Sequence, residues 1–129
     1  MNKILIEVSV GELLDKISIL EIKKDKIKNP EKLKFINDEH SILKNQLDQN
    51  VKSDAKLNKL FNSLKEINAK LWVIEDDKRM CEKNSNFTEN FIKLSRDVHF
   101  LNDNRAKIKL EINTITGSKI KEIKEYTAY

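Results

Sequence analysis

Apolar residues spaced three and four positions apart constrain the fold of this 129-residue chain more than any other feature. Such spacing places apolar side chains along one face of an α-helix, where they pack on a neighbouring helix. Four separate segments follow it, so we expect four helices. The series are Leu13, Ile17, Leu20 and Ile27; Leu33, Ile36, Leu43 and Leu47; Leu57, Leu60, Leu64, Ile67, Leu71 and Ile74; and Phe91, Leu94, Val98, Leu101, Ile108, Ile112 and Ile115.

Capping and turn residues divide these segments. The chain has only two glycines and one proline, so breaks between helices are few. Serine and threonine cap helix N-termini, proline suits a first turn, and glycine commonly follows a helix. The signals in chain order are the Ser9–Glu12 capping box, Asn29-Pro30, Ser53, Thr88 and Gly117. They predict helices over residues 10–28, 30–49, 54–82 and 89–116.

Four amphipathic helices joined by short connections favour an all-α fold, an antiparallel four-helix bundle in a single domain over residues 1–129. The helices over 54–82 and 89–116 are about ten residues longer than the first two, so their hairpin is expected to project. The tail from residue 118 is expected to form a short helix or an extended cover.

Residues 3–10, KILIEVSV, alternate apolar and other side chains with period two, which is typical of a short strand. One strand cannot satisfy its own backbone groups. The segment is therefore expected to pair with another chain or copy, or to lie as an extended arm against the helices.

Each apolar series carries one polar interruption, and these are Lys24, His40, Lys78 and Arg105. With a rise of about 1.5 Å per residue, Lys24 and Arg105 are expected to face one another across one layer of the bundle. Buried cations need partners. The candidate carboxylates are Glu21, Glu75 and Asp103.

Three interpretations of this layer stay open: a structural ion pair that fixes helix register, an anionic ligand, and long side chains that reach solvent. In the ligand interpretation, Lys24, Arg105 and Lys109 bind phosphate or carboxylate, and Glu75 is the candidate acid or base. Trp72, the only tryptophan, then offers a stacking platform for a sugar or base, or it simply packs in the core.

Several kinds of site are not indicated. His40 and His99 are isolated, so no metal site is expected, and no glycine-rich phosphate loop or other cofactor motif is present. Cys81, the only cysteine, has no activating base at helical spacing. No signal peptide or membrane span is visible, and a cytoplasmic location is expected.

Charge and surface apolar residues suggest partners. The net charge is +4, and residues 105–129 hold six basic and three acidic residues, so nucleic-acid binding by this quarter is an alternative. The last helix has a second apolar face with Ile92, Phe100, Ala106 and Leu110. Such a face implies a partner surface or the returning tail, and with the N-terminal segment it favours a homodimer.

The segments VSVGELLDKISILEIK, LWVIEDD and FIKLSRDVHFLNDNRAKIKLEIN, with the GS that follows, resemble a family of small bacterial and phage proteins of unknown function. The resemblance covers most of the chain in the same order. It implies no activity and no catalytic residue. It implies a role in glycan or nucleotide-sugar metabolism, because relatives lie near genes for sugar transfer.

The leading hypothesis is a non-enzymatic helical binding or regulatory module that is dimeric, because no catalytic constellation stands beside the interaction surfaces. The second is an enzyme or sensor that binds a phosphorylated or nucleotide-sugar ligand in a cationic pocket. The third is nucleic-acid binding through the basic C-terminal quarter.

Overall fold

The computed structural model describes residues 1–129 and contains four α-helices and no strand. The all-α prediction is confirmed, and every predicted helix boundary lies within two residues of the observed one. The third and fourth helices, of 29 and 28 residues, are longer than the first two, of 17 and 21. The helices are α1 (Val10–Lys26), α2 (Pro30–Asn50), α3 (Ala55–Lys83) and α4 (Glu89–Thr116).

Side-chain caps begin three of the helices. Ser9, Asn29 and Asp54 each accept a hydrogen bond from a backbone N–H of the first turn, which satisfies a donor that has no partner inside the helix. Asp54, not Ser53, is therefore the cap of α3. Thr88 precedes α4, but its hydroxyl donates to Asn86 Oδ1 at 2.7 Å and makes no cap. Gly117 ends α4 with a φ of 67°, in the left-handed conformation that glycine adopts without strain.

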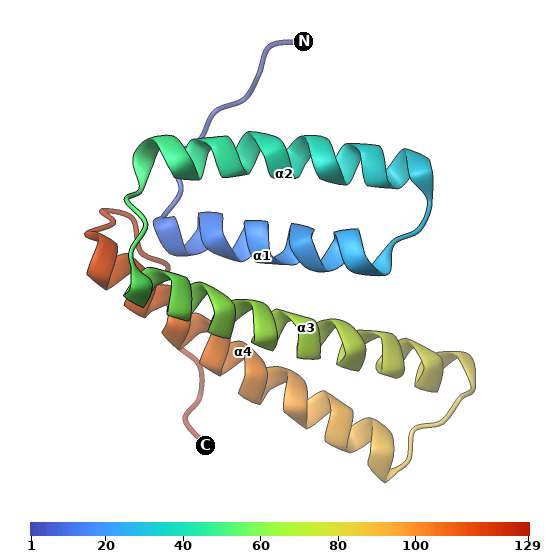
Figure 1. Cartoon of the computed structure of the whole chain (residues 1–129). Coiled ribbons are helices and arrows are strands. Elements are labelled where there is room, and N and C mark those ends of the chain that lie inside the picture. The colour runs from blue at the N-terminus through green and yellow to red at the C-terminus, as the bar shows by residue number, and fades with distance from the viewer.

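The helices form two antiparallel hairpins, and α1 lies at the centre of the molecule (Figure 1). Helix α1 packs against α2 on one side and against the α3–α4 pair on the other, whereas α2 packs its length on α1 alone. A helix in contact with three others must bury more than one face. This explains why residues all around α1 are buried: Gly11, Leu14, Asp15, Ile17, Ser18, Leu20 and Ile22.

The hydrophobic core lies where α1, α3 and α4 meet. Leu14, Leu57, Leu64 and Ile112 form its buried cluster, and partly buried apolar side chains surround it. Gly11 permits the close approach of α1 to α4, because a Cβ there would lie 2.7 Å from the backbone oxygen of Lys109. The amide of Gly11 donates at 2.7 Å to Asn113 Oδ1 on α4, which fixes this crossing.

Both ends of the chain lie outside the helices. Residues 1–9 precede α1 as an arm without strand pairing, and Ile4, Leu5 and Ile6 are exposed along it. The arm runs away from the bundle past α2 (Figure 1). Residues 118–129 form no helix, so the short-helix alternative for the tail is wrong. The tail returns along α4, where the Tyr129 ring lies 5.3 Å from that of Phe100.

Candidate functional site

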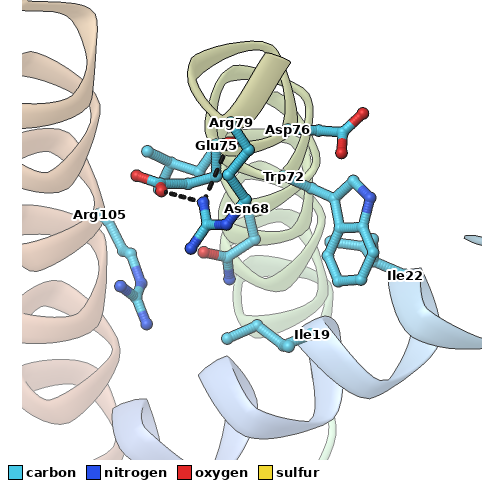
Figure 2. A pocket seen from close by; sticks show the side chains of 9 residues that line it. Ile19, Ile22, Asn68, Trp72, Glu75, Asp76, Arg79 and Arg105 are labelled. Carbon is cyan, nitrogen blue, oxygen red and sulfur yellow. Dashed lines mark hydrogen bonds and ion pairs between the residues drawn. The ribbon is translucent and has the colours of Figure 1, made fainter. Parts of the chain in front are cut away.

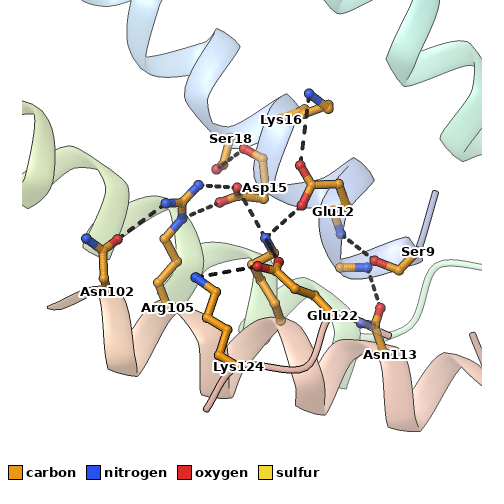
Figure 3. Close-up of polar contacts among 12 residues, drawn as sticks. Ser9, Glu12, Asp15, Lys16, Ser18, Asn102, Arg105, Asn113, Glu122 and Lys124 are labelled. Carbon is orange, nitrogen blue, oxygen red and sulfur yellow. Dashed lines mark hydrogen bonds and ion pairs between the residues drawn. The ribbon is translucent and has the colours of Figure 1, made fainter. Parts of the chain in front are cut away.

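An ion pair between Asp15 of α1 and Arg105 of α4 lies at the centre of the polar interior (Figure 3). Arg105 Nε donates to Asp15 Oδ1 at 2.9 Å, and Nη2 donates to Asp15 Oδ2, so the guanidinium holds the carboxylate by two parallel bonds. Arg105 Nη1 donates to Asn102 Oδ1 at 3.3 Å. The Asp15 side chain is only 2% exposed and that of Arg105 is 27% exposed, so the carboxylate is the buried partner.

Asn68 of α3 and Ser18 of α1 complete the surroundings of this carboxylate. Asn68 Nδ2 donates to Asp15 Oδ1 and to Ser18 Oγ, both at 2.8 Å. Ser18 Oγ donates to the backbone oxygen of Asp15 at 2.8 Å. No buried side-chain polar atom is left without a partner. The buried polar centre is thus internally satisfied, as a structural network must be.

Lys109 extends the network one turn along α4. Its Nζ lies 2.8 Å from Glu12 Oε2, 3.7 Å from Asp15 Oδ2 and 3.3 Å from Glu122 Oε2. The Lys109 side chain is 12% exposed, so three carboxylates from α1 and the tail neutralise a largely buried ammonium. Glu122 thereby ties the tail to the bundle.

The charges of this network shift its pKa values. Burial alone raises the pKa of Asp15, but hydrogen bonds from Arg105 and Asn68 and the charges of Arg105 and Lys109 outweigh it, so that pKa lies below its ordinary value. The hydrogen bond to Asp15 raises the pKa of Arg105. For Lys109, burial lowers the pKa, yet its bond to Glu12 and the nearby carboxylates raise it overall. All three groups therefore stay ionised at neutral pH.

The prediction that Lys24 faces Arg105 across one layer of the bundle is wrong. Asp15 is the residue of α1 that meets Arg105, and Lys24 lies nine positions further along the helix, roughly 13 Å away. Lys24 is half-buried and lies outside the ion pair that Arg105 makes with Asp15. The height estimate failed because it assumed four helices side by side, whereas α1 crosses α4 near its own N-terminus.

The three carboxylates proposed as partners of Arg105 have other partners. Glu21 lies 3.2 Å from His40 Nε2 on α2 and 3.0 Å from Lys65 Nζ on α3. Glu75 accepts from Arg79 one turn along α3, at 2.8 Å. The Tyr129 hydroxyl donates to Asp103.

Glu21 also links three helices, because α1 carries it between α2 and α3. Burial raises the pKa of Glu21, but hydrogen bonds from Lys65 and His40 lower it below the ordinary value. His40, which interrupts the apolar series of α2, is therefore a contact between α2 and α1. No group of histidine, cysteine and acidic side chains has the arrangement of a metal site.

A pocket of about 380 Å³ brings together three of the predicted site residues, Trp72, Glu75 and Arg105. It opens between α1 and the α3–α4 hairpin, with Ile19 on α1 and Asn68 on α3 in its walls (Figure 2). Lys109 lies on the other side of Arg105 and lines a different hollow, beside the tail. Lys24 lines neither of these two.

Sequence reasoning missed Asp15, Asn68 and Glu12, the residues that neutralise or orient the cations. Asp15 and Asn68 lie just beside the apolar stripes and look there like ordinary surface residues. One available signal was the apolar character of α1 on several sides, which indicates a central helix whose polar residues are also buried.

The sequence pattern of DUF6165, a family of unknown function, matches residues 4–129. The chain belongs to this family. The match covers nearly the whole length of this DUF6165 protein, from the arm to the tail. No curated protein and no solved structure matches it. None of its helices combines the length and apolar character needed to cross a membrane.

Proposed function

We propose that the protein is a non-enzymatic helical binding module that works as a homodimer, joined through the outer face of its α3–α4 hairpin. The observation that carries this proposal is an apolar groove on that face, lined by Ala69, Lys70, Val73, Ile74, Asp97, Phe100 and Leu101. We call it the outer groove.

The outer groove faces away from α1. Val73 follows Asn68 by five residues, so it projects roughly 140° around α3 from the side chain that binds Asp15. Val73 is 47% exposed and Phe100 39% exposed, although both are large and apolar. Exposed apolar side chains gathered in one groove are typical of an interaction surface.

The charges at the groove favour a second copy of the chain as its occupant. Lys70 lines it from α3 and Asp97 lines it from α4. In a two-fold dimer each patch meets its own copy, so Lys70 of one protomer and Asp97 of the other form two equivalent pairs. The hairpin face is large enough, since two helices about 40 Å long and about 20 Å wide together offer about 800 Å² per protomer.

The satisfied polar centre supports a binding role over catalysis. Catalytic acids and bases commonly have pKa values shifted toward neutral pH, whereas the pKa values of Asp15, Arg105 and Lys109 are shifted away from it. Here Asp15, Arg105 and Lys109 are paired with one another and with Glu12. The C-terminal quarter is less suited to nucleic acid, because three of its six basic residues, Arg105, Lys109 and Lys124, are already paired with carboxylates. The cytoplasmic location, the bacterial or phage origin and the role in glycan metabolism stay predictions.

Analytical ultracentrifugation over a concentration series tests the homodimer. The wild-type chain should sediment as a dimer, and Val73→Glu and Phe100→Glu should sediment as monomers, because each buries a carboxylate in the interface. Phe35→Glu is the matched control: Phe35 is 76% exposed on α2, far from the outer groove, and this variant should stay dimeric. A wild-type chain that is monomeric at about 100 µM contradicts the proposal.

A charge-reversal pair tests the two-fold geometry. Lys70→Glu and Asp97→Lys each place like charges opposite one another in their own homodimers, so each alone should dimerise weakly. Mixing the two variants should restore dimers, because every pair in the mixed dimer then joins opposite charges. This rescue excludes misfolding as the cause of the single effects. Two variants that stay monomeric when mixed rule out this pairing of Lys70 with Asp97.

A further inference from the structure

The pocket between α1, α3 and α4 differs in character from the outer groove, because charges of both signs surround an apolar floor. Ile19, Ile22, Leu71 and Trp72 form the floor. The charged lining residues are Glu75, Asp76, Arg79 and Arg105, which sum to zero formal charge. A volume of about 380 Å³ suits a small molecule.

Arg105 presents unused donors to this pocket. A guanidinium carries five N–H groups. The Nε–H and one Nη2–H of Arg105 donate to Asp15, and one Nη1–H donates to Asn102. One N–H on each of Nη1 and Nη2 remains, and the paired terminal N–H groups of a guanidinium are the donors that commonly bind the two oxygens of a carboxylate. The bonds to Asp15 hold this fork rigid before any ligand arrives.

Glu75 presents an unused acceptor. Its Oε2 accepts from Arg79 Nη1 at 2.8 Å, and its Oε1 makes no bond within the protein. Asn68 lines the same pocket, and its amide nitrogen is fully used by Asp15 and Ser18 while its carbonyl oxygen is not. These two oxygens match the hydrogens of an ammonium group.

These charged groups and the apolar side chains lie on opposite sides of the pocket (Figure 2). Figure 2 shows Arg105 and Glu75 on one side of the pocket and Trp72 and Ile22 on the other. A carboxylate and an ammonium that are close together therefore find partners on one side, and an apolar group attached to them reaches the aromatic and aliphatic side chains opposite.

We propose that this pocket binds a small zwitterion: a free α-amino acid with an aromatic or branched apolar side chain. Its carboxylate meets the open fork of Arg105, its ammonium meets Glu75 and Asn68, and its side chain packs on Trp72, Ile19 and Ile22. Phosphorylated compounds fit less well, because Asp15 and Glu75 already neutralise the two arginines. The site lies apart from the outer groove and does not depend on dimerisation.

The fluorescence of Trp72, the only tryptophan, reports on this pocket directly. Titration of the purified full chain with L-phenylalanine or L-leucine should give a saturable change. Phenethylamine, which lacks the carboxylate, and 3-phenylpropionate, which lacks the ammonium, should each bind about tenfold more weakly or worse, since each leaves a charged partner unmatched. Glucose and inorganic phosphate should give no saturable change.

A matched pair of variants on α3 tests the ammonium contact. Glu75→Gln should weaken phenylalanine binding about tenfold, because an amide replaces a charged acceptor. Glu66→Gln makes the same change at an exposed, unpaired glutamate of the same helix and should bind like wild type. Both side chains lie at or near the surface, so neither variant should unfold, and circular dichroism checks this.

Four results would overturn the proposal. The first is no saturable response to any apolar amino acid up to about 10 mM, well above the millimolar Kd of a weak specific site. The second is equal binding of phenylalanine and its two one-charge analogues, which would make the pocket merely apolar. The third is unchanged phenylalanine affinity in Glu75→Gln. Saturable binding of phosphate or glucose in place of amino acids would likewise assign the pocket to another ligand class.

Discussion

Arg105 occupies an apolar position of the α4 stripe because a buried carboxylate from another helix meets it there. A buried pair gains Coulomb energy but loses hydration, so its net contribution to stability is small. Its larger effect is on specificity, because any other register of α1 on α4 leaves Asp15 without Arg105 and Asn68. The pair therefore selects one arrangement of helices among several that bury similar apolar area.

Removing one partner of this pair should be far more costly than removing both. Arg105→Met leaves the Asp15 carboxylate buried without its main partner and should lower the free energy of unfolding by about 3–5 kcal/mol. Asp15→Leu should lower the free energy of unfolding by a similar amount, because Arg105 then loses its carboxylate partner. The double variant should lose clearly less stability than the sum of the two single losses. Urea unfolding of the wild type and the three variants measures this coupling energy between Asp15 and Arg105.

The partner changes Glu21→Gln and Glu75→Gln should not rescue Arg105→Met, since neither carboxylate contacts Arg105. A single variant Arg105→Met that is more stable than wild type would mean that Arg105 is held as an unpaired, repelled cation, against the structure.

Asp15 should also make stability depend on pH. Its pKa in the folded chain lies below the ordinary value of 3.8, so ionised Asp15 stabilises the fold above pH 3.8. As the pH falls below 3.8, the unfolded chain takes up this proton first, and the stabilisation is lost by the time the pH passes the folded pKa. Asp15→Asn lacks this titration, so its stability deficit should shrink in that range.

Urea unfolding of the wild type and Asp15→Asn at a series of pH values gives this difference directly. Glu21 titrates in the same acid range with the same sign, but it is present in both proteins and cancels. A deficit that stays constant down to pH values below 3.8 would contradict the lowered pKa of Asp15.

At the scale of the elements, helix ends are readable in the sequence because caps act locally. Ser9, Asn29 and Gly117 each satisfy backbone groups within a few residues, and each marks the helix end that it predicted. Contacts between helices are not local. The spacing of apolar residues in α1 shows a buried stripe but not which helix covers it, and so Lys24 was placed where Asp15 lies.

The N-terminal arm should add little to the stability of the bundle. Residues 1–8 make no hydrogen bond to it, and Ile4, Leu5 and Ile6 are exposed. A chain that begins at Ser9 after an initiating Met should have a free energy of unfolding within about 0.5 kcal/mol of the wild-type value. Ser9→Ala is the contrasting change, because it removes the cap on Glu12 N and should cost about 1 kcal/mol.

Urea unfolding compares these two proteins, and ultracentrifugation of the shortened chain should still give a dimer, since the outer groove is intact. A large loss of stability on truncation would mean that the arm packs on the bundle. Loss of the dimer would mean that the arm, rather than the groove, joins the protomers.

At the scale of the whole molecule, the architecture is more open than a square four-helix bundle. Helix α2 packs its length on α1 alone, so the core is shared mainly by α1, α3 and α4. The sequence predicts the helices, their lengths and the longer α3–α4 hairpin. It does not predict the central place of α1, because this depends on how Gly11, Asn113 and the Asp15 network bring distant segments together.

The candidate pocket was predictable only in part for the same reason. Trp72 and Glu75 share one turn of α3, and their proximity follows from sequence alone. That Arg105 joins them, with Ile19 and Ile22 closing the floor, follows from the crossing of α1 over the hairpin. Long-range packing thus determines which helices meet at the pocket. Local spacing determines which residues of each helix face it.

The separation of Asp15 and Arg105 by 90 positions has a consequence during protein synthesis. Ribosomes add about 5–20 residues per second, so Asp15 is made on the order of 5 to 20 seconds before Arg105. In that interval the α1–α2 hairpin can form, yet the carboxylate that it will later bury must stay in water. The side of α1 that carries Asp15 therefore stays uncovered until α4 leaves the ribosome, and the order of translation delays the closing of the interior to the last quarter of the chain.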